Sequence, residues 1–209
     1  MKLNFRSATL GLGLVLFGGL FVPDAIAQSA FVQLRVSVFN SSPISSSTIE
    51  RAEGEAGRVL RDIGVEAIWL NCPQETPQES YPGRCSEVSF PSHLRLWILR
   101  VSHGLNISTV GISYLAEDGR GCYADLFYEP IQELGKQTAV SPSIILGHAM
   151  AHELGHLLLG ANSHSPSGLM RAHWTGEDLT NASQGNLRFS KEQCLKIRNR
   201  LTSLETSHP

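Results

Sequence analysis

The sequence predicts an α/β (α+β) fold of one domain, with a mixed, twisted sheet of about five strands and helices divided around it. Three observations predict it. Val32, Leu34, Val36 and Val38 alternate with their neighbours over 31–39, as in a strand with one buried face. The apolar residues of 48–63 share one helical face. Two apolar segments flank a strong turn signal at 117–121, which predicts a hairpin.

The N-terminal half alternates strands with one backing helix. Ser45 offers an N-cap for that helix, and Gly64 ends it. The predicted elements are a strand over 31–39, a helix over 48–63 and strands over 65–70 and 94–101. A proline-rich loop over 71–91 separates the last two strands.

The C-terminal half contains the hairpin and two helices. Ser141 and Pro142 suit the N-cap and first position of a helix that Gly160 ends, and Ser190 caps a final helix. The predicted elements are a hairpin of 110–115 and 122–128, a helix over 142–159, an irregular polar stretch over 161–187 and a helix over 191–204. No helical pattern is evident over 174–180.

The first 27 residues predict a secretory signal peptide. Lys2 and Arg6 precede an apolar run over 8–22, and Ala25-Ile26-Ala27 is a small-residue cleavage site before Gln28. An uncleaved membrane anchor is the alternative, but the run is shorter than the about 20 apolar residues of a span. We therefore expect a secreted or periplasmic protein whose mature chain, 28–209, is one domain.

Charge and hydropathy restrict the partners. The net charge is −2 and the pI is about 6.4, so no nucleic acid or anionic membrane surface is indicated. No second segment is apolar enough to cross a membrane, so we expect no stable membrane association after cleavage. We expect a monomer.

Four cysteines in an exported chain favour two disulfides. Cys72 with Cys85 is the preferred pair, because it closes the proline-rich loop locally, and this leaves Cys122 with Cys194. A cysteine-based metal site is the alternative, but the chain has no close Cys-x-x-Cys pair.

The segment His152-Glu153-Leu154-Gly155-His156 carries the chemistry. On a helix, His152 and His156 project from one face and can bind one metal ion, and Glu153 can take a proton from a metal-activated water. Zinc is the natural metal for hydrolysis at such a site. An inert surface helix is the alternative, but the surrounding residues are mostly apolar, and burying these groups without a partner would be costly.

A catalytic zinc ion usually takes a third protein ligand. After Gly160 the chain can turn back, which brings His164 within reach, and Met170 follows six residues later. With these residues the sequence resembles the metzincin metallopeptidases, which have a zinc-binding helix, a glycine, a third histidine and a turn carrying Met beneath the metal. Their usual spacing would place the glycine and the histidine at Leu159 and Asn162, whereas here they come one and two residues later.

Other residues compete for these roles. Glu177 would be the third ligand in a thermolysin-like plan, and His173 is a further candidate. His148 lies two turns before His156, too far to share one tetrahedral site, and is assigned no chemistry. Met170 is alternatively an ordinary core residue.

The resemblance implies a secreted zinc endopeptidase acting on a peptide or protein substrate. Zn²⁺ on His152, His156 and His164 would activate a water, with Glu153 as general base. By the same resemblance, residues 111–115 would be an edge strand that pairs with an extended peptide. A zinc-binding protein without proteolytic activity, and zinc hydrolysis of a non-peptide bond, are the other candidate functions.

Overall fold

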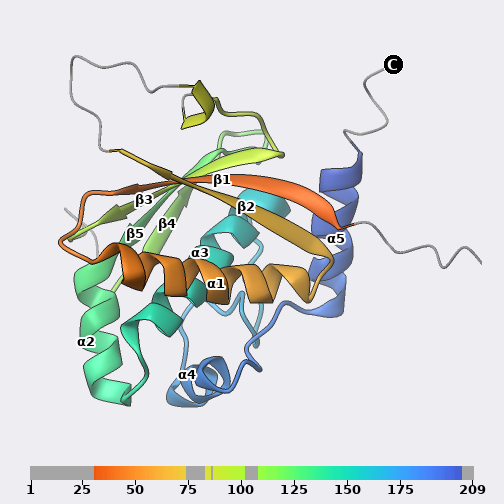
Figure 1. Cartoon of the computed structure of the whole chain (residues 1–209). Coiled ribbons are helices and arrows are strands. Elements are labelled where there is room, and N and C mark those ends of the chain that lie inside the picture. Colours follow the sequence, from red (N-terminus) through yellow and green to blue (C-terminus); the bar gives the residue numbers. More distant parts are fainter. Residues whose placement is uncertain (1–30, 74–82, 86, 102–107, 204–209) are drawn as a thin grey trace, which may run out of the picture.

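The computed structural model describes residues 31–73, 83–85, 87–101 and 108–203, and within them a five-stranded sheet is the central layer (Figure 1). The strands are β1 (Val32–Asn40), β2 (Val65–Cys72), β3 (His93–Leu99), β4 (Gly111–Tyr114) and β5 (Tyr123–Phe127). Their order is β2-β1-β3-β5-β4, and all neighbours are parallel except β4 and β5. The predicted mixed sheet is confirmed, and β4 forms one of its edges.

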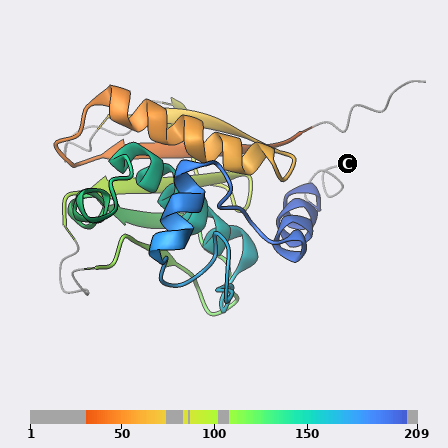
Figure 2. The same cartoon turned by 90° about the horizontal axis from the view of Figure 1, so that it is seen from below.

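Five α-helices accompany the sheet within the described ranges. They are α1 (Ser46–Arg61), α2 (Tyr128–Thr138), α3 (Pro142–Leu159), α4 (Gly176–Ser183) and α5 (Lys191–Thr202). α1, α2 and α3 lie on one side of the sheet, and α4 packs against α3 (Figures 1 and 2). The short 3₁₀ turn η1 (Gly83–Cys85) lies on the other side.

The two faces of the sheet differ in the side chains that they carry. The face away from α1 and α3 carries Arg95 and Asp125, which alternate with the buried residues Leu96 and Ala124 of the opposite face. Phe39, Trp97 and Tyr123 form a row of aromatic rings on that face, with neighbouring centroids 5.2 and 6.0 Å apart. The Arg95 guanidinium lies over this row, 5.7 Å from the ring centroids of Phe39 and Tyr123.

Local signals explain the two long helices. The Ser45 hydroxyl accepts the Thr48 amide at the start of α1, and Pro142 opens α3 as predicted. The helices approach closely at Gly147, where a Cβ atom would lie 2.6 Å from the carbonyl oxygen of Ala52. Because α3 is covered by the sheet, α1 and α4, nearly all of its residues are buried.

Two helices were absent from the sequence prediction. α2 begins directly after β5 without a side-chain cap, and Pro130 and Gly135 hide its helical pattern. α4 lies in the stretch predicted to be irregular, which corrects that prediction. It is only eight residues long, and a reciprocal capping box between Thr175 and Asp178 stabilises its start.

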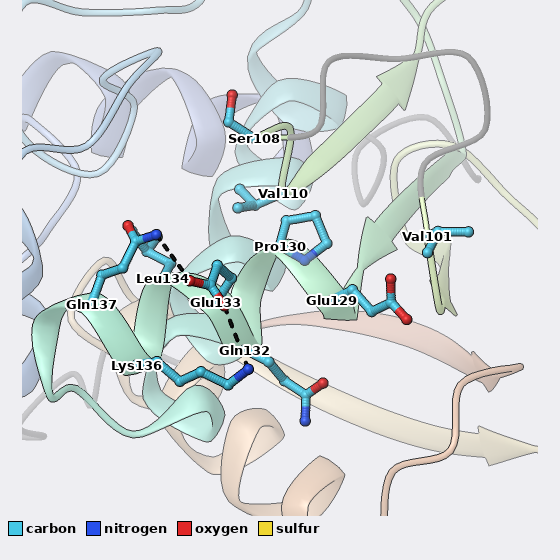
Figure 3. A pocket seen from close by; sticks show the side chains of 10 residues that line it. All are labelled: Val101, Ser108, Val110, Glu129, Pro130, Gln132, Glu133, Leu134, Lys136 and Gln137. Carbon is cyan, nitrogen blue, oxygen red and sulfur yellow. Dashed lines mark hydrogen bonds and ion pairs between the residues drawn. The ribbon is translucent and has the colours of Figure 1, made fainter.

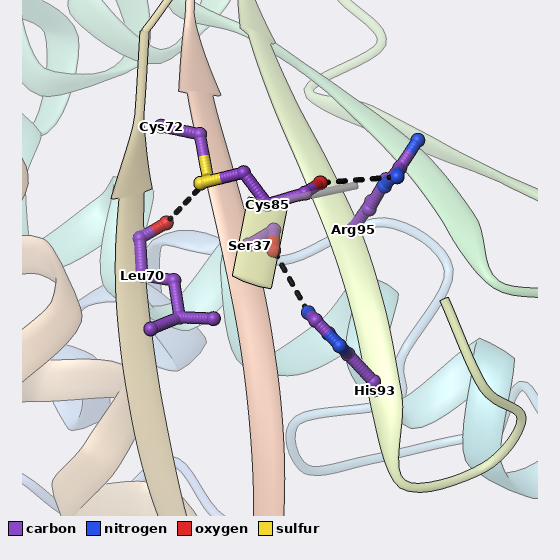
Figure 4. Close-up of a disulfide and its surroundings, with 6 residues drawn as sticks. All are labelled: Ser37, Leu70, Cys72, Cys85, His93 and Arg95. Carbon is purple, nitrogen blue, oxygen red and sulfur yellow. Dashed lines mark hydrogen bonds between the residues drawn. A yellow bond between two sulfur atoms is a disulfide. The ribbon is translucent and has the colours of Figure 1, made fainter. Parts of the chain in front are cut away.

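The cysteines give one confirmed and one wrong pairing. Cys72 and Cys85 form a disulfide that links the end of β2 to η1, and Arg95 donates a 3.0 Å hydrogen bond to the Cys85 carbonyl (Figure 4). Cys122 and Cys194 are free thiols. Cys122 precedes β5 in the sheet, whereas Cys194 lies on α5, which packs against α3 and β1, so the two belong to different layers.

The predicted signal peptide over 1–27 lies outside the described residues, and so does part of the proline-rich loop. No helix in the described part of the chain is long and apolar enough to cross a bilayer.

Candidate metal centre

Three imidazoles converge at the C-terminal end of α3. His152 and His156 lie one helical turn apart, and their Nε2 atoms are 3.0 Å from each other. Gly160 and Asn162, with φ angles of 89° and 58°, turn the chain back towards the helix. His164 then places its Nε2 atom 3.1 Å from that of His156. The longer turn absorbs the two-residue delay seen in the sequence.

The arrangement of the nitrogens fits a metal ion. Bonds of 2.0–2.1 Å to zinc in tetrahedral geometry separate two ligand nitrogens by about 3.3 Å. The Nδ1–H group of His152 donates to the carbonyl oxygen of Leu169 at 2.7 Å, so Nε2 of the neutral ring carries a lone pair. This lone pair faces Nε2 of His156 at 3.0 Å, where it can accept a hydrogen bond or bind a cation that the two rings share.

The protonation state also suits a metal. Burial lowers the pKa of His152 to about 4 and that of His156 to about 3, and it lowers the pKa of His164 as well. All three rings are therefore neutral near pH 7. Neutral imidazole is the form that binds a metal ion.

Hydrogen bonds outside the cluster orient the rings. Ser163 Oγ hydrogen-bonds with His156 Nδ1 at 2.7 Å, and the Leu169 carbonyl that holds His152 also accepts from Trp174 Nε1 at 3.0 Å. Such partners fix the ring orientation of metal-binding histidines. Ser163 and Leu169 were not among the residues predicted from the sequence. Only the position of Ser163 beside His164 hints at its role, because a main-chain carbonyl leaves no signal in the sequence.

Met170 lies in a tight turn beneath α3. The turn is closed by a 2.9 Å hydrogen bond from the Ser165 amide to the Met170 carbonyl, and the Met170 side chain is fully buried. A Cβ atom on Gly155 would lie 2.6 Å from Met170 Sδ, so the glycine between the two histidines allows this close packing. Met170 therefore supports the helix at the level of the ring cluster.

Glu153 is buried beside the histidines, with a relative exposure of 3%. Its Oε2 atom accepts a 2.7 Å hydrogen bond from Ser113 on β4. Burial raises the pKa of Glu153 to about 7, and the hydrogen bond from Ser113 opposes the rise. A carboxyl group with such a pKa can both accept and release a proton near neutral pH.

Neither competing ligand candidate joins the three-histidine group. Glu177 is exposed on α4, and neither it nor His173 belongs to the three-histidine group, which is the group of potential metal ligands found among the described residues. His148 is fully buried one turn before His152. Its Nδ1 atom hydrogen-bonds with the Ile144 carbonyl, and its Nε2 atom lies 3.5 Å from Glu55.

A separate pocket lies beside α2 (Figure 3). Val110, which directly precedes β4, forms part of its wall together with Pro130 and Leu134. Glu133 on the same wall contacts Lys136 at 3.4 Å. The pocket therefore flanks the start of the edge strand rather than the histidine cluster.

Comparison with solved structures identifies a metzincin-like fold. Archaemetzincin from Methanopyrus kandleri superimposes with a TM-score of 0.50 and 15% identity, over 85% of this chain and 99% of that chain. A zinc-dependent peptidase from Methanocorpusculum labreanum gives a TM-score of 0.51 and 12% identity, over 78% and 99%. No protein-family model and no curated protein matches the sequence. At these identities the similarity shows the fold, and it confirms the predicted resemblance.

Proposed function

We propose that this protein is an exported, zinc-dependent endopeptidase. The observation that carries the proposal is the convergence of three neutral imidazoles, His152, His156 and His164, beside the buried carboxyl group of Glu153. A purely structural zinc site is closed by four protein ligands, whereas three ligands leave one position for water or substrate. A carboxyl group next to an open position is what general-base hydrolysis requires.

The residues of the site would have different roles in peptide hydrolysis. A zinc ion on the three Nε2 atoms would supply a water of lowered pKa and a Lewis acid for the scissile carbonyl. Glu153 would act as the general base, holding at a carboxylate oxygen the proton that the attacking water gives up and that the leaving amine takes. The Leu169 carbonyl and Ser163 keep the rings of His152 and His156 oriented throughout.

Strand β4 supports a peptide as the substrate. The Phe127 amide donates to the Val110 carbonyl at 2.9 Å, so Val110 and, by alternation, Ile112 face β5 with their main-chain groups. The N–H and C=O groups of Gly111 and Ser113 then face away from the sheet. An extended peptide can add to such an edge regardless of its sequence, which suits an endopeptidase.

The proposed location of the protein is outside the cytoplasm. A signal peptide over 1–27 and the Cys72–Cys85 disulfide favour a secreted or periplasmic protein. The partner is a peptide or protein substrate, and the protein acts as a monomer.

Metal removal and replacement test the proposal. The mature protein is incubated with a mixed peptide library before chelation, after chelation and after addition of one equivalent of zinc. We expect internal cleavage that chelation abolishes and zinc restores. A protein that binds one zinc ion but cleaves no peptide would favour the zinc-binding, non-proteolytic alternative.

A further inference from the structure

The edge strand contacts the general base of the proposed peptidase directly. Ser113 Oγ lies 2.7 Å from Glu153 Oε2 and 3.0 Å from the main-chain carbonyl oxygen of Glu153. Two residues earlier, a Cβ atom on Gly111 would lie 2.6 Å from Glu153 Oε1 and 2.8 Å from its Cδ. The carboxyl group is therefore held on one side by a hydroxyl group and faces a glycine on the other.

The two contacts of Ser113 join the side chain and the main chain of one residue. The Ser113 hydroxyl can donate to Oε2 or to the main-chain carbonyl oxygen of Glu153, because both lie within hydrogen-bond distance. Ser113 therefore ties the carboxyl group of Glu153 and the main chain of α3 to the same point on β4.

We propose that Ser113 is a positioning residue that holds the Glu153 carboxyl group in one place, with Gly111 leaving the space for it. This inference rests on the proposed function for the role of Glu153 as general base, but the placement of Glu153 is independent of it. The same two residues offer their main-chain groups to a docked peptide.

Alternative roles for Ser113 make different predictions. If its hydroxyl only bound substrate, its loss would raise KM and leave kcat unchanged. If it only stabilised the sheet, its loss would lower the free energy of unfolding without moving Glu153. A positioning role lowers kcat and displaces the carboxyl group while zinc stays bound.

Substitutions at two positions on β4 separate these cases. Ser113→Ala removes the donor, and Ser113→Thr keeps it. Tyr114→Phe is the matched control, because it also removes one hydroxyl from β4, but that hydroxyl binds Asp125 on the opposite face of the sheet.

The first measurement needs no activity. Zinc-free protein with ¹³C-labelled glutamate carboxyl groups is studied by NMR, and the Glu153 signal is assigned by its loss in Glu153→Gln. We expect the Glu153 signal to shift in Ser113→Ala and to stay in place in Tyr114→Phe. An unchanged signal in Ser113→Ala would overturn the inference, whether or not the protein is a peptidase.

The second measurement uses the zinc-loaded protein and a peptide cleaved by the wild type. In Ser113→Ala we expect kcat to fall about tenfold, as for loss of one hydrogen bond to a charged group, with KM and zinc content unchanged. Ser113→Thr restores kcat. Wild-type kcat in Ser113→Ala, or a rise in KM alone, would contradict the positioning role. Absence of cleavage by the wild type would contradict the proposed function, and the NMR result would still decide the placement of Glu153.

Discussion

The candidate metal site is formed by one nitrogen atom, Nε2, from each of three histidines. The Leu169 carbonyl fixes the proton of His152 on Nδ1, and Ser163 fixes the ring of His156, so their Nε2 atoms meet at one point. His164 completes the group from a turn rather than from the helix. In the proposed zinc site, each of these contacts would contribute separately to metal affinity.

Substitutions can show how much each residue contributes to the zinc affinity. His164→Ala removes a ligand and should weaken zinc binding far more than Ser163→Ala, for which we expect a loss of about 10–100-fold. Glu177→Gln should leave the affinity unchanged. Competition with a chromogenic chelator measures all three dissociation constants. Strong loss of zinc in Glu177→Gln, with little change in His164→Ala, would transfer the third-ligand role to Glu177.

Gly155, which lies between His152 and His156 on α3, has a packing role. In Gly155→Ala the new methyl group would meet Met170 Sδ at 2.6 Å and the Phe189 ring at 2.8 Å. We expect a loss of about 1–3 kcal/mol in the free energy of unfolding of zinc-free protein, as for other overpacked sites. Gly54→Ala on α1 is the control, since nothing lies within 4 Å of its added methyl group. A gain of up to about 1 kcal/mol is expected there. Urea unfolding measures both, and equal gains would contradict the close packing of Met170 against α3.

Helices α1 and α3 enclose a buried histidine, His148. Burial lowers the pKa of His148 below its ordinary value, although Glu55 lies 3.5 Å away. The unfolded chain takes up a proton at His148 near pH 6.5, and the folded chain does not, so His148 lowers stability as the pH falls below that value.

The variant His148→Leu tests this coupling. Between pH 6.5 and 5, its unfolding free energy should fall less steeply than that of the wild type, by up to about 1.4 kcal/mol per pH unit. Urea unfolding of zinc-free protein at several pH values gives the two slopes. Identical slopes would show that His148 has the same pKa in the folded and the unfolded chain, which would contradict its lowered pKa.

Most elements could be predicted because their signals are local. Ser45, Pro142 and Ser190 mark helix starts that the structure confirms to within two residues. α2 could not be predicted, because Pro130 and Gly135 oppose its helical pattern and packing overrides them. The contact of Ser113 with Glu153 also escaped prediction, since 40 residues separate the two and only the sheet brings them together.

The cysteines show which parts of the fold are covalently joined. The Cys72–Cys85 disulfide ties β2 to η1, whereas Cys122 and Cys194 are free in different layers. Denatured mature protein should therefore titrate with two thiols under non-reducing conditions. Cys122→Ser and Cys194→Ser should each remove one of them. A protein without titratable thiols would contradict the structure and restore the second predicted disulfide.

The fold brings three imidazoles together and holds the Glu153 carboxyl group against the edge strand β4. The most direct test of this account is turnover by Glu153→Ala at matched zinc content. We predict one zinc ion per chain in both proteins, and peptide cleavage slower than wild type by at least about 100-fold in the variant. Appreciable peptidase activity in zinc-loaded Glu153→Ala would contradict the role of Glu153 as the general base.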